Sequence, residues 1–277
     1  MGARLPEIQA VAARILRHTI RHMRQSFEAR PGTFTASLAY EYPAGWQVPA
    51  HSHRSDQLIY GIRGVMEVNA ADTLWLVPPQ SALWIPADLK HSIRMPSAVS
   101  MRTLYLRPAL LRNRACGVIQ VAPLLRELIL EVVRRGELKI RGRLDRALFD
   151  VLKAQISGAS QLPTTLSMPR DARARRLAES IIANPRASEK LDAQCRRIGV
   201  SVRTMQRAFR QDVGTDFETW RRQARILSAV PLLIGGQSIK AVSYAVGYRQ
   251  AATFVAMFRR VLGATPKAWV SALQERI

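Results

Sequence analysis

The stretch GVSVRTMQRAFRQDVG (Gly199–Gly214) decides the fold of the C-terminal half, because the chain repeats its pattern as GYRQAATFVAMFRRVLG (Gly247–Gly263). Each stretch holds a glycine, a helical segment and the ending Phe-Arg-x-x-x-Gly, and the two endings are 49 residues apart. A short helical segment precedes each first glycine, at 191–197 and 239–246. Helix, glycine turn and helix in this order predict two helix-turn-helix units.

The turn residues of the first unit have physical roles. Gly199 can end the first helix in a left-handed conformation, which a Cβ atom disfavours. Ser201 can then cap the second helix by accepting a hydrogen bond from one of its free N–H groups.

The motifs of this region, in their order and spacing, resemble the AraC/XylS family of bacterial transcription regulators over about residues 172–272. They are Gly199-Val200-Ser201, Arg203-Thr204, Arg207-x-Phe209, Trp220-Arg221-Arg222-Gln223, Gly236-x-Ser238-Ile239, Ala245-x-Gly247-Tyr248, Phe254-x-x-x-Phe258-Arg259-Arg260 and Gly263-x-Thr265-Pro266.

The resemblance implies two helix-turn-helix units joined by one long helix, here Phe217 to Ile234, and double-stranded promoter DNA as partner. Each second helix then enters the major groove, and successive grooves on one face of DNA lie about 34 Å apart. Pro231 departs from the family pattern and predicts a kink in the connecting helix, because proline lacks the N–H that the helix needs.

In the first unit, Met205, Ala208 and Phe209 are expected to face inward. Arginine can bond guanine with two hydrogen bonds and glutamine can do so with adenine, so outward side chains here are candidate base readers. Arg203, Gln206 and Arg207 share one helical face, whereas Arg210 lies later and is expected at phosphate. The candidate DNA-binding residues of this unit are Ser201, Arg203, Thr204, Gln206, Arg207 and Arg210.

The second unit offers few long polar side chains and lacks the small capping residue usual in the family near Arg249 or Gln250. We therefore expect weaker sequence readout from this half. Its candidate DNA-binding residues are Arg249, Gln250, Ala251, Thr253, Arg259 and Arg260.

The N-terminal half is expected to be a sandwich or barrel, because short segments rich in β-branched and aromatic residues alternate with turn residues between Thr33 and Leu106. It contains Gly45-x5-His51-x-His53-x3-Gln57-x6-Gly64, then Pro86-x-Asp88-x2-His91. These motifs resemble those of cupins, small double-sheet β-barrels, although cupins usually have Glu at Gln57 and Gly at Asp88.

His51 and His53 are two residues apart, so on a strand both would point into the barrel, and His91 would come from a facing strand. Three imidazoles with the Gln57 amide could bind a divalent transition metal such as Fe, Mn, Ni or Zn. The alternative is an effector pocket without metal, lined by aromatic residues and Met66; the candidates are Trp46, Tyr60, Met66, Trp75 and Trp84.

We therefore predict an α+β protein of two domains, a cupin-like β-barrel and an all-α domain with two helix-turn-helix motifs joined by a long helix. The expected parts are an N-terminal extension helix (1–30, with Met1 and Met23 both candidate starts), the effector-binding barrel (31–108), a helical dimerisation or covering segment (109–157), a linker (158–171) and the DNA-binding domain (172–277). Apolar stripes near Val121–Val133 and Arg143–Ile156 suggest helices that cover the barrel or pair two subunits.

The charge balance agrees with a nucleic-acid partner but does not locate its site. The 277-residue chain carries a formal net charge of +22, and residues 170–277 have 20 Lys and Arg against 8 Asp and Glu. Two distant cysteines, Cys116 and Cys195, exclude a disulfide scaffold and suit a reducing cytoplasm. No apolar run reaches the ~18–20 residues of a membrane span, so a membrane partner is not expected.

The sequence therefore predicts a cytoplasmic bacterial transcription regulator, not an enzyme. It would form a homodimer, respond to a small-molecule effector in the barrel and have RNA polymerase as a further candidate partner. Two alternatives remain: a metal-dependent cupin oxygenase with a helical appendage, and a non-specific nucleic-acid-binding protein.

Overall fold

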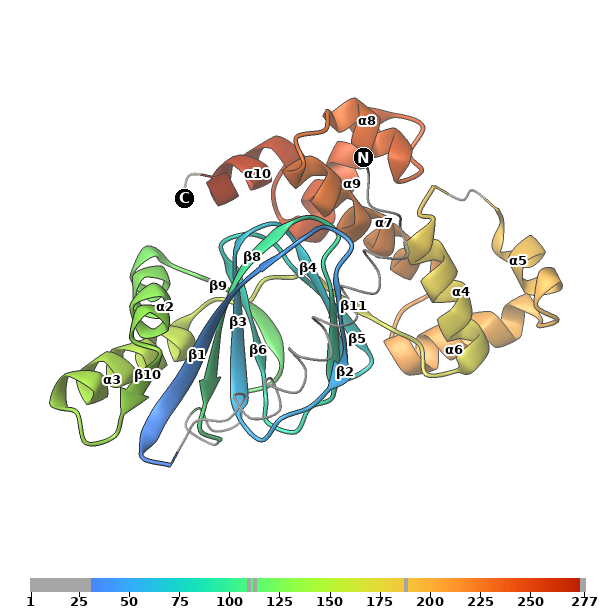
Figure 1. The fold of residues 1–277 in the computed structure, drawn as a ribbon. Coiled ribbons are helices and arrows are strands. Elements are labelled where there is room, and N and C mark those ends of the chain that lie inside the picture. The colour runs from blue at the N-terminus through green and yellow to red at the C-terminus, as the bar shows by residue number, and fades with distance from the viewer. Residues whose placement is uncertain (1–30, 109–110, 112–113, 187–188, 275–277) are drawn as a thin grey trace, which may run out of the picture.

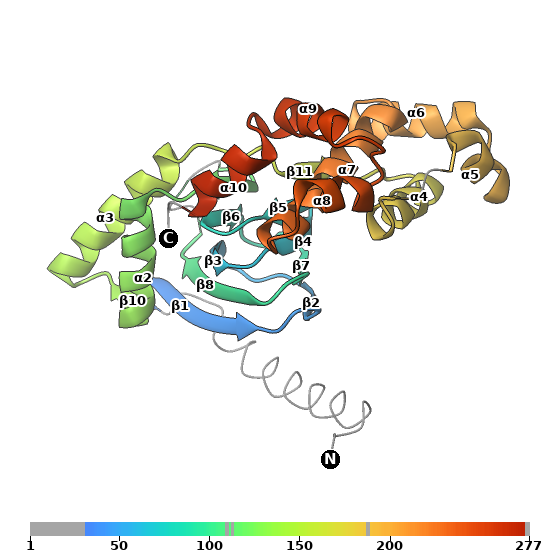
Figure 2. The same ribbon diagram turned by 90° about the horizontal axis from the view of Figure 1, so that it is seen from above.

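The protein has four layers in the computed structural model, which describes residues 31–108, 111, 114–186 and 189–274 (Figure 1). A helical hairpin, two β-sheets and a C-terminal group of helices follow one another across the molecule. Figure 2 shows the hairpin at one end of the β-structure and most C-terminal helices at the other. The expected N-terminal helix falls in 1–30, outside the described residues.

The β-unit consists of two antiparallel sheets. The six-stranded sheet has the order β10-β1-β8-β3-β6-β9, and the five-stranded sheet has the order β11-β5-β4-β7-β2. The strands are β1 (Thr33–Tyr42), β2 (Gln47–His51), β3 (Asp56–Arg63), β4 (Met66–Ala70), β5 (Thr73–Val77), β6 (Ser81–Ile85), β7 (His91–Arg94), β8 (Val99–Leu106), β9 (Gly117–Gln120), β10 (Glu137–Lys139) and β11 (Thr165–Ser167).

Side-chain alternation along β3 divides the core into two parts. Ile59 faces the space between the sheets, where it packs in one cluster with Met66 and Val68 of the opposite sheet. Leu58 and Tyr60 face the other way, into a second cluster beneath the helical hairpin. Two of the aromatic residues expected to line the pocket, Tyr60 and Trp84, therefore lie outside the barrel, whereas Trp46, Met66 and Trp75 belong to its interior.

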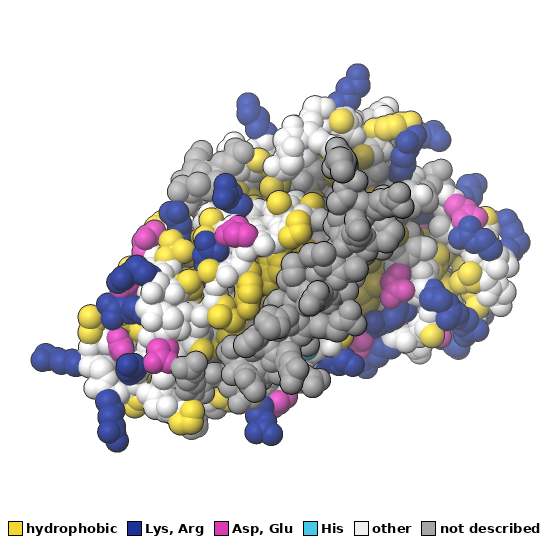
Figure 3. Space-filling view, viewed as in Figure 1, with side chains coloured by type: hydrophobic (Ala, Val, Ile, Leu, Met, Phe, Trp, Pro, Cys, Tyr) yellow, Lys and Arg dark blue, Asp and Glu magenta, His cyan; other side chains and the backbone are white. Residues whose placement is uncertain are grey.

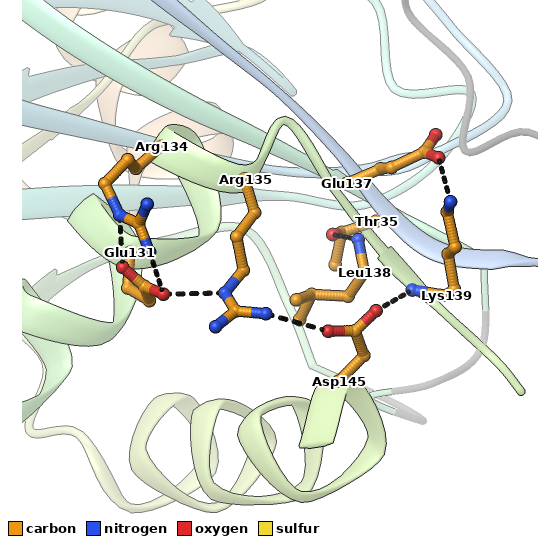
Figure 4. Close-up of polar contacts among 8 residues, drawn as sticks. All are labelled: Thr35, Glu131, Arg134, Arg135, Glu137, Leu138, Lys139 and Asp145. Carbon is orange, nitrogen blue, oxygen red and sulfur yellow. Dashed lines mark hydrogen bonds and ion pairs between the residues drawn. The ribbon is translucent and has the colours of Figure 1, made fainter. Parts of the chain in front are cut away.

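The hairpin consists of α2 (Pro123–Arg135) and α3 (Arg143–Gly158), which cover the outer face of the six-stranded sheet. Most of the two predicted apolar stripes is buried there, including Leu128, Val132 and Leu152. Figure 4 shows how the hairpin is tied: Arg135 bonds Glu131 at 2.6 Å and Asp145 at 3.2 Å, and Asp145 also accepts from the Lys139 backbone N–H. The stripes therefore serve mainly to cover the barrel, with few side chains left for a partner.

The sheets include strands from outside the expected barrel segment 31–108. β9 and β10 come from the segment expected to be only helical, and β11 comes from the segment 158–171 expected to be a linker. β11 pairs with β5 from Thr165↔Trp75 to Ser167↔Thr73. The expected boundaries differ here because three- and four-residue strands carry too little periodicity to be recognised in the sequence.

The C-terminal unit packs on the outer face of the five-stranded sheet, where Leu74 and Leu76 join the helices in one core cluster. Its centre holds Phe209, Phe217 and Trp220, whose rings meet edge to face at 5.2–5.3 Å. The helices are α4 (Ala172–Ala183), α5 (Leu191–Arg197), α6 (Val202–Val213), α7 (Phe217–Ile234), α8 (Ile239–Ala245), α9 (Ala251–Leu262) and α10 (Pro266–Gln274).

Helix α7 connects the two halves of this unit and continues for three residues past Pro231. Its Arg225 donates from Nε to the Pro185 carbonyl oxygen at 2.9 Å, which ties the loop after α4 to the centre of the helix. Among the described residues, no helix combines the length and the apolar character that crossing a membrane requires.

Candidate DNA interface and histidine site

The turn between α5 and α6 has the predicted geometry. Gly199 has φ +68°, in the left-handed region. The Ser201 hydroxyl accepts from the Thr204 backbone N–H at 3.0 Å and caps α6. Met205 and Phe209 are buried and seat the helix on the core. The opposite side of α6 is thereby turned outward.

That outward side carries three exposed arginines, Arg203, Arg207 and Arg210. Gln206 differs from the expectation of an outward reader. It is half-buried, and its Oε1 atom is enclosed without a hydrogen-bond partner among the described residues. Thr204 is also half-buried, and its hydroxyl contacts the Ser201 hydroxyl at 2.9 Å. Arg203 and Arg207 are therefore the best-placed candidates for reading bases on α6.

The second unit, α8 to α9, has the same turn with a weaker cap. Gly247 has φ +88°, but Gln250 at the N-cap makes no capping hydrogen bond through its side chain. Phe254 and Phe258 are buried against the core. Of the candidate DNA-binding residues, Ala251 is half-buried and the others are exposed: Arg249, Gln250, Thr253, Arg259 and Arg260.

Figure 3 shows Lys and Arg side chains at both ends of the molecule on the face drawn, not in one patch. Several at the hairpin end are paired with carboxylates, as Arg134 and Arg135 are with Glu131. Within the part of the chain that the structure describes, the exposed arginines of α6 and α9 have no carboxylate partner, which makes them candidates for contacts with DNA phosphates.

A second candidate site lies between the sheets, where His51, His53 and His91 converge (the histidine triad). One ring nitrogen of each lies within 4.8 Å of the others. His51 and His91 are register partners on the neighbouring strands β2 and β7, and β2 ends at His51, so His53 follows the strand. The expectation of a facing strand for His91 is therefore wrong, because β7 belongs to the same sheet as β2.

Each triad histidine is oriented by a backbone carbonyl two residues away. The Nδ1 atoms lie 2.8 Å from the Pro49 oxygen for His51, 2.7 Å from the Ser55 oxygen for His53 and 2.9 Å from the Leu89 oxygen for His91. In neutral His91, a carbonyl at Nδ1 holds the proton there and leaves the Nε2 lone pair available, as in histidines that bind metals. The Nε2 atom of His91 is buried with no hydrogen-bond partner among the described residues.

Burial keeps two of these imidazoles neutral. Loss of solvent lowers the pKa of His91 to about 4, and it also lowers the pKa of His51. At pH 7 both rings therefore present lone pairs and not charges, which is the form that a metal or a hydrogen-bond donor requires.

Gln57 comes from β3 in the opposite sheet and lies next to the triad. Its Oε1 is 2.9 Å from His53 Nε2, and its Nε2 lies 3.0 Å from both the Thr103 hydroxyl and the Tyr105 hydroxyl. Thr103 and Tyr105 were missed by the sequence reasoning. Their alternate positions on the predicted strand Met101–Leu106 were the available signal, since side chains two apart face the same side.

A hollow of about 380 Å³ lies on the other side of this region, between the five-stranded sheet and the C-terminal unit. Its wall includes His91 of β7 and Lys90 just before that strand, Met168 just after β11, and Arg175 of α4. A residue of the triad thus also borders the junction of the two units.

Two family models match the chain in the two units just described. The model of an AraC-like ligand binding domain matches residues 36–162, and the model of a helix-turn-helix domain matches residues 194–272.

The chain belongs to the AraC family of transcription regulators. It has a ligand-binding domain and a helix-turn-helix DNA-binding domain. The regulator is 28% identical over 226 residues to the HTH-type transcriptional regulator NimR of Escherichia coli strain K12, a match covering 81% of this chain and 83% of NimR. It is 34% identical over 107 residues to the regulator RipA of Corynebacterium glutamicum, covering 39% of this chain and 32% of RipA.

Among solved structures, ToxT from Vibrio cholerae matches 87% of this chain and 99% of its own, with 11% identity and a TM-score of 0.38. A cupin superfamily protein from Desulfitobacterium hafniense matches 27% of this chain and 68% of its own, with 19% identity and a TM-score of 0.26.

Proposed function

We propose that the regulator binds promoter DNA sequence-specifically through α6 and, more weakly, through α9, and that a small-molecule effector bound beside the histidine triad controls this binding. The observation that carries the proposal is the joining, in one chain, of a helix-turn-helix domain to a ligand-binding domain whose interior gathers polar groups. Promoter binding assigns the protein to the cytoplasm of a bacterium and makes RNA polymerase a candidate partner.

The two DNA-binding helices differ in their means of recognition. α6 is capped and presents Arg203 and Arg207 at positions suited to base edges. α9 presents Thr253 and small side chains, with Arg259 and Arg260 near its C-terminal end. We infer that α6 selects the sequence and that α9 contributes phosphate contacts and a close fit to the groove.

Competition between selected and random DNA tests this function. A fragment enriched from a random library by the full chain should bind at least about 10³-fold more tightly than random DNA of the same length at the same salt concentration. Equal affinities would favour the alternative of a non-specific nucleic-acid-binding protein. A turnover assay with the metal-loaded chain and dioxygen tests the oxygenase alternative. We do not favour this alternative, because the relatives of this chain are transcription regulators.

The residues of the triad fit a divalent transition metal. His51, His53 and His91 would hold it through Nε2, and the Gln57 amide oxygen is the neighbouring candidate for a fourth ligand. Such an ion would supply open coordination positions for an effector. Thr103 and Tyr105 orient Gln57, and the backbone carbonyls at Nδ1 orient the histidines.

We predict that His51→Ala and His91→Ala each reduce bound Ni²⁺ or Zn²⁺ from about one ion per chain to none, because two imidazoles cannot replace three. Metal content after dialysis measures this. DNA affinity without effector should stay unchanged, while the effector response is lost. Asn69→Ala, at an exposed position on neighbouring β4, is the control and should retain the metal. Metal and response that both survive His51→Ala would remove the site from the pocket.

We further propose that the regulator forms a homodimer through α3. Leu144 and Val151 are 58% and 42% exposed, and together with half-buried Leu148 they form one strip on the side of α3 turned away from the sheet. Leu144→Asp with Val151→Asp should convert a dimer into a monomer, since burying carboxylates in an interface is costly. Sedimentation at micromolar concentration measures this, and a monomeric wild-type chain would contradict the proposal.

A further inference from the structure

The turn between β4 and β5 has an unusual backbone. Ala71 and Asp72 connect the two strands, and their φ angles are +50° and +53°. A two-residue hairpin turn with positive φ at both positions normally has the sequence Asn-Gly, Asp-Gly or Gly-Gly, because a Cβ atom is crowded there. Alanine in particular is disfavoured. Contacts from elsewhere must therefore hold this turn in place.

Those contacts come from the segment that leads into the DNA-binding domain. The Asp72 backbone oxygen accepts from the Met168 N–H at 2.8 Å. Its carboxylate accepts from Arg175 Nη2 of α4 at 2.5 Å and lies 3.4 Å from Arg170 Nε. One exposed residue of the ligand-binding domain thus contacts three residues beyond it.

The same segment is bonded to the helices on its other side. Trp220 Nε1 of α7 donates to the Ser167 oxygen at 2.8 Å, and Gln223 Nε2 donates to the Thr165 oxygen at 2.7 Å. Asp212, near the end of α6, accepts from the backbone N–H groups of Arg170 and Asp171 at 2.8 and 2.9 Å. The contacts of Asp72 therefore lead through residues 165–171 to the helix that carries Arg203 and Arg207.

The turn is also next to the histidine triad. His91 on β7 is the register partner of Ala70, the last residue of β4 and the neighbour of Ala71. On its other side His91 pairs with His51 on β2. If binding of an ion or effector at the histidine triad shifts β7, the shift would therefore act directly on Ala70, the residue just before the turn.

We propose that the Ala71–Asp72 turn is a latch between the two domains, with Asp72 as the positioning residue that couples occupancy of the histidine triad to the placement of α4 and α6. This rests on the proposed function of an effector-controlled regulator. The ion pairs of the latch are partly exposed, with Asp72 and Arg175 side chains 46% and 35% accessible. Such pairs are weak and can be released by a small change, as a switch requires.

Hydrogen exchange on the full chain without DNA or metal tests the latch directly. Asp72→Asn removes the charge but keeps a residue that tolerates positive φ. We expect exchange at the Met168 amide and at residues 165–167 to become about fivefold faster or more, with β3 and α9 unchanged. Arg175→Gln should reproduce part of this effect, because Asp72 also pairs with Arg170. The double variant should not exceed Asp72→Asn, because both single changes act on the Asp72–Arg175 pair. Arg176→Gln is the matched control on an exposed position of α4.

Unchanged exchange at Met168 in both single variants would overturn the latch. So would faster exchange of the whole chain, which would indicate global destabilisation.

A second measurement tests the coupling, with Ni²⁺ alone as the probe. In the wild type, saturating Ni²⁺ should change the affinity for the selected DNA fragment by about 5–150-fold, the usual range for allosteric coupling. In Asp72→Asn this ratio should fall close to one while the Ni²⁺ and DNA affinities measured separately persist. A ratio that Asp72→Asn leaves intact would overturn the coupling. If the wild type binds no Ni²⁺ or selects no DNA, the proposed function fails, and the exchange experiment still decides the latch.

Discussion

Replacing Arg207 by alanine is expected to remove most of the preference of the regulator for its selected DNA sequence while leaving the fold intact. Arg207 is exposed on α6, one turn after Arg203 and on the opposite side from buried Met205 and Phe209. A bidentate arginine–guanine contact is worth about 1–3 kcal/mol of discrimination, or about 5–150-fold in affinity ratio. The ratio of affinities for selected and random DNA, measured at one salt concentration, reports this loss.

Arg210→Ala is the matched control for that experiment. Arg210 lies on the same helix with the same exposure class and is expected at phosphate. Its loss should weaken binding to all sequences about equally. It should also reduce the slope of log affinity against log salt concentration by about 1, because one fewer phosphate is neutralised. An unchanged footprint and unchanged selectivity in Arg207→Ala would contradict the assignment of α6 as the helix that reads the bases.

Gly247→Ala should destabilise the DNA-binding domain strongly. A Cβ atom at this position would lie 2.9 Å from the Pro185 carbonyl oxygen and 3.1 Å from the Arg225 guanidinium carbon. It would thus crowd the hydrogen bond between those two groups, which ties the loop after α4 to α7. The positive φ adds about 1–2 kcal/mol and the overlap with backbone about 1–3 kcal/mol more. Denaturant unfolding measures this loss, and DNA binding should fall with it.

Gly199→Ala separates the two causes. Gly199 has a similar positive φ in the first unit, but an added Cβ would meet no atom within 4 Å. It should therefore show only the backbone cost of about 1–2 kcal/mol. Equal destabilisation by the two substitutions would mean that the close approach of Pro185 to Gly247 has no energetic effect.

Helix-turn-helix units could be predicted from the sequence because their signals are local. The glycine at the turn, the serine cap and the inward positions Met205 and Phe209 all lie within a few residues of one another, and the structure has each as predicted. The outward position of Gln206 was predicted from helical geometry alone. The structure differs from this prediction because other parts of the same chain enclose the amide oxygen of Gln206, and the sequence of α6 alone does not reveal this.

The histidine site was predictable in its members but not in its arrangement. Spacing suggested that His51, His53, Gln57 and His91 belong together. Which strands are neighbours depends on pairing over long separations, so the sequence could not show that β7 lies beside β2. It also could not show that Thr103 and Tyr105 hold Gln57, since that contact crosses 46 and 48 residues.

By itself, the sequence determined the two-domain α+β class, the helix-turn-helix pattern, the residues of the histidine site and the family, because these depend on short-range spacing. Only the tertiary structure decided that the apolar stripes of α2 and α3 cover the sheet, that the segment 158–171 contributes a strand, and that Asp72 meets Arg175 across 103 residues. Burial and strand pairing across such separations depend on the packing of the whole chain. Which surface of an element is covered is therefore decided by the positions of elements far away in the sequence.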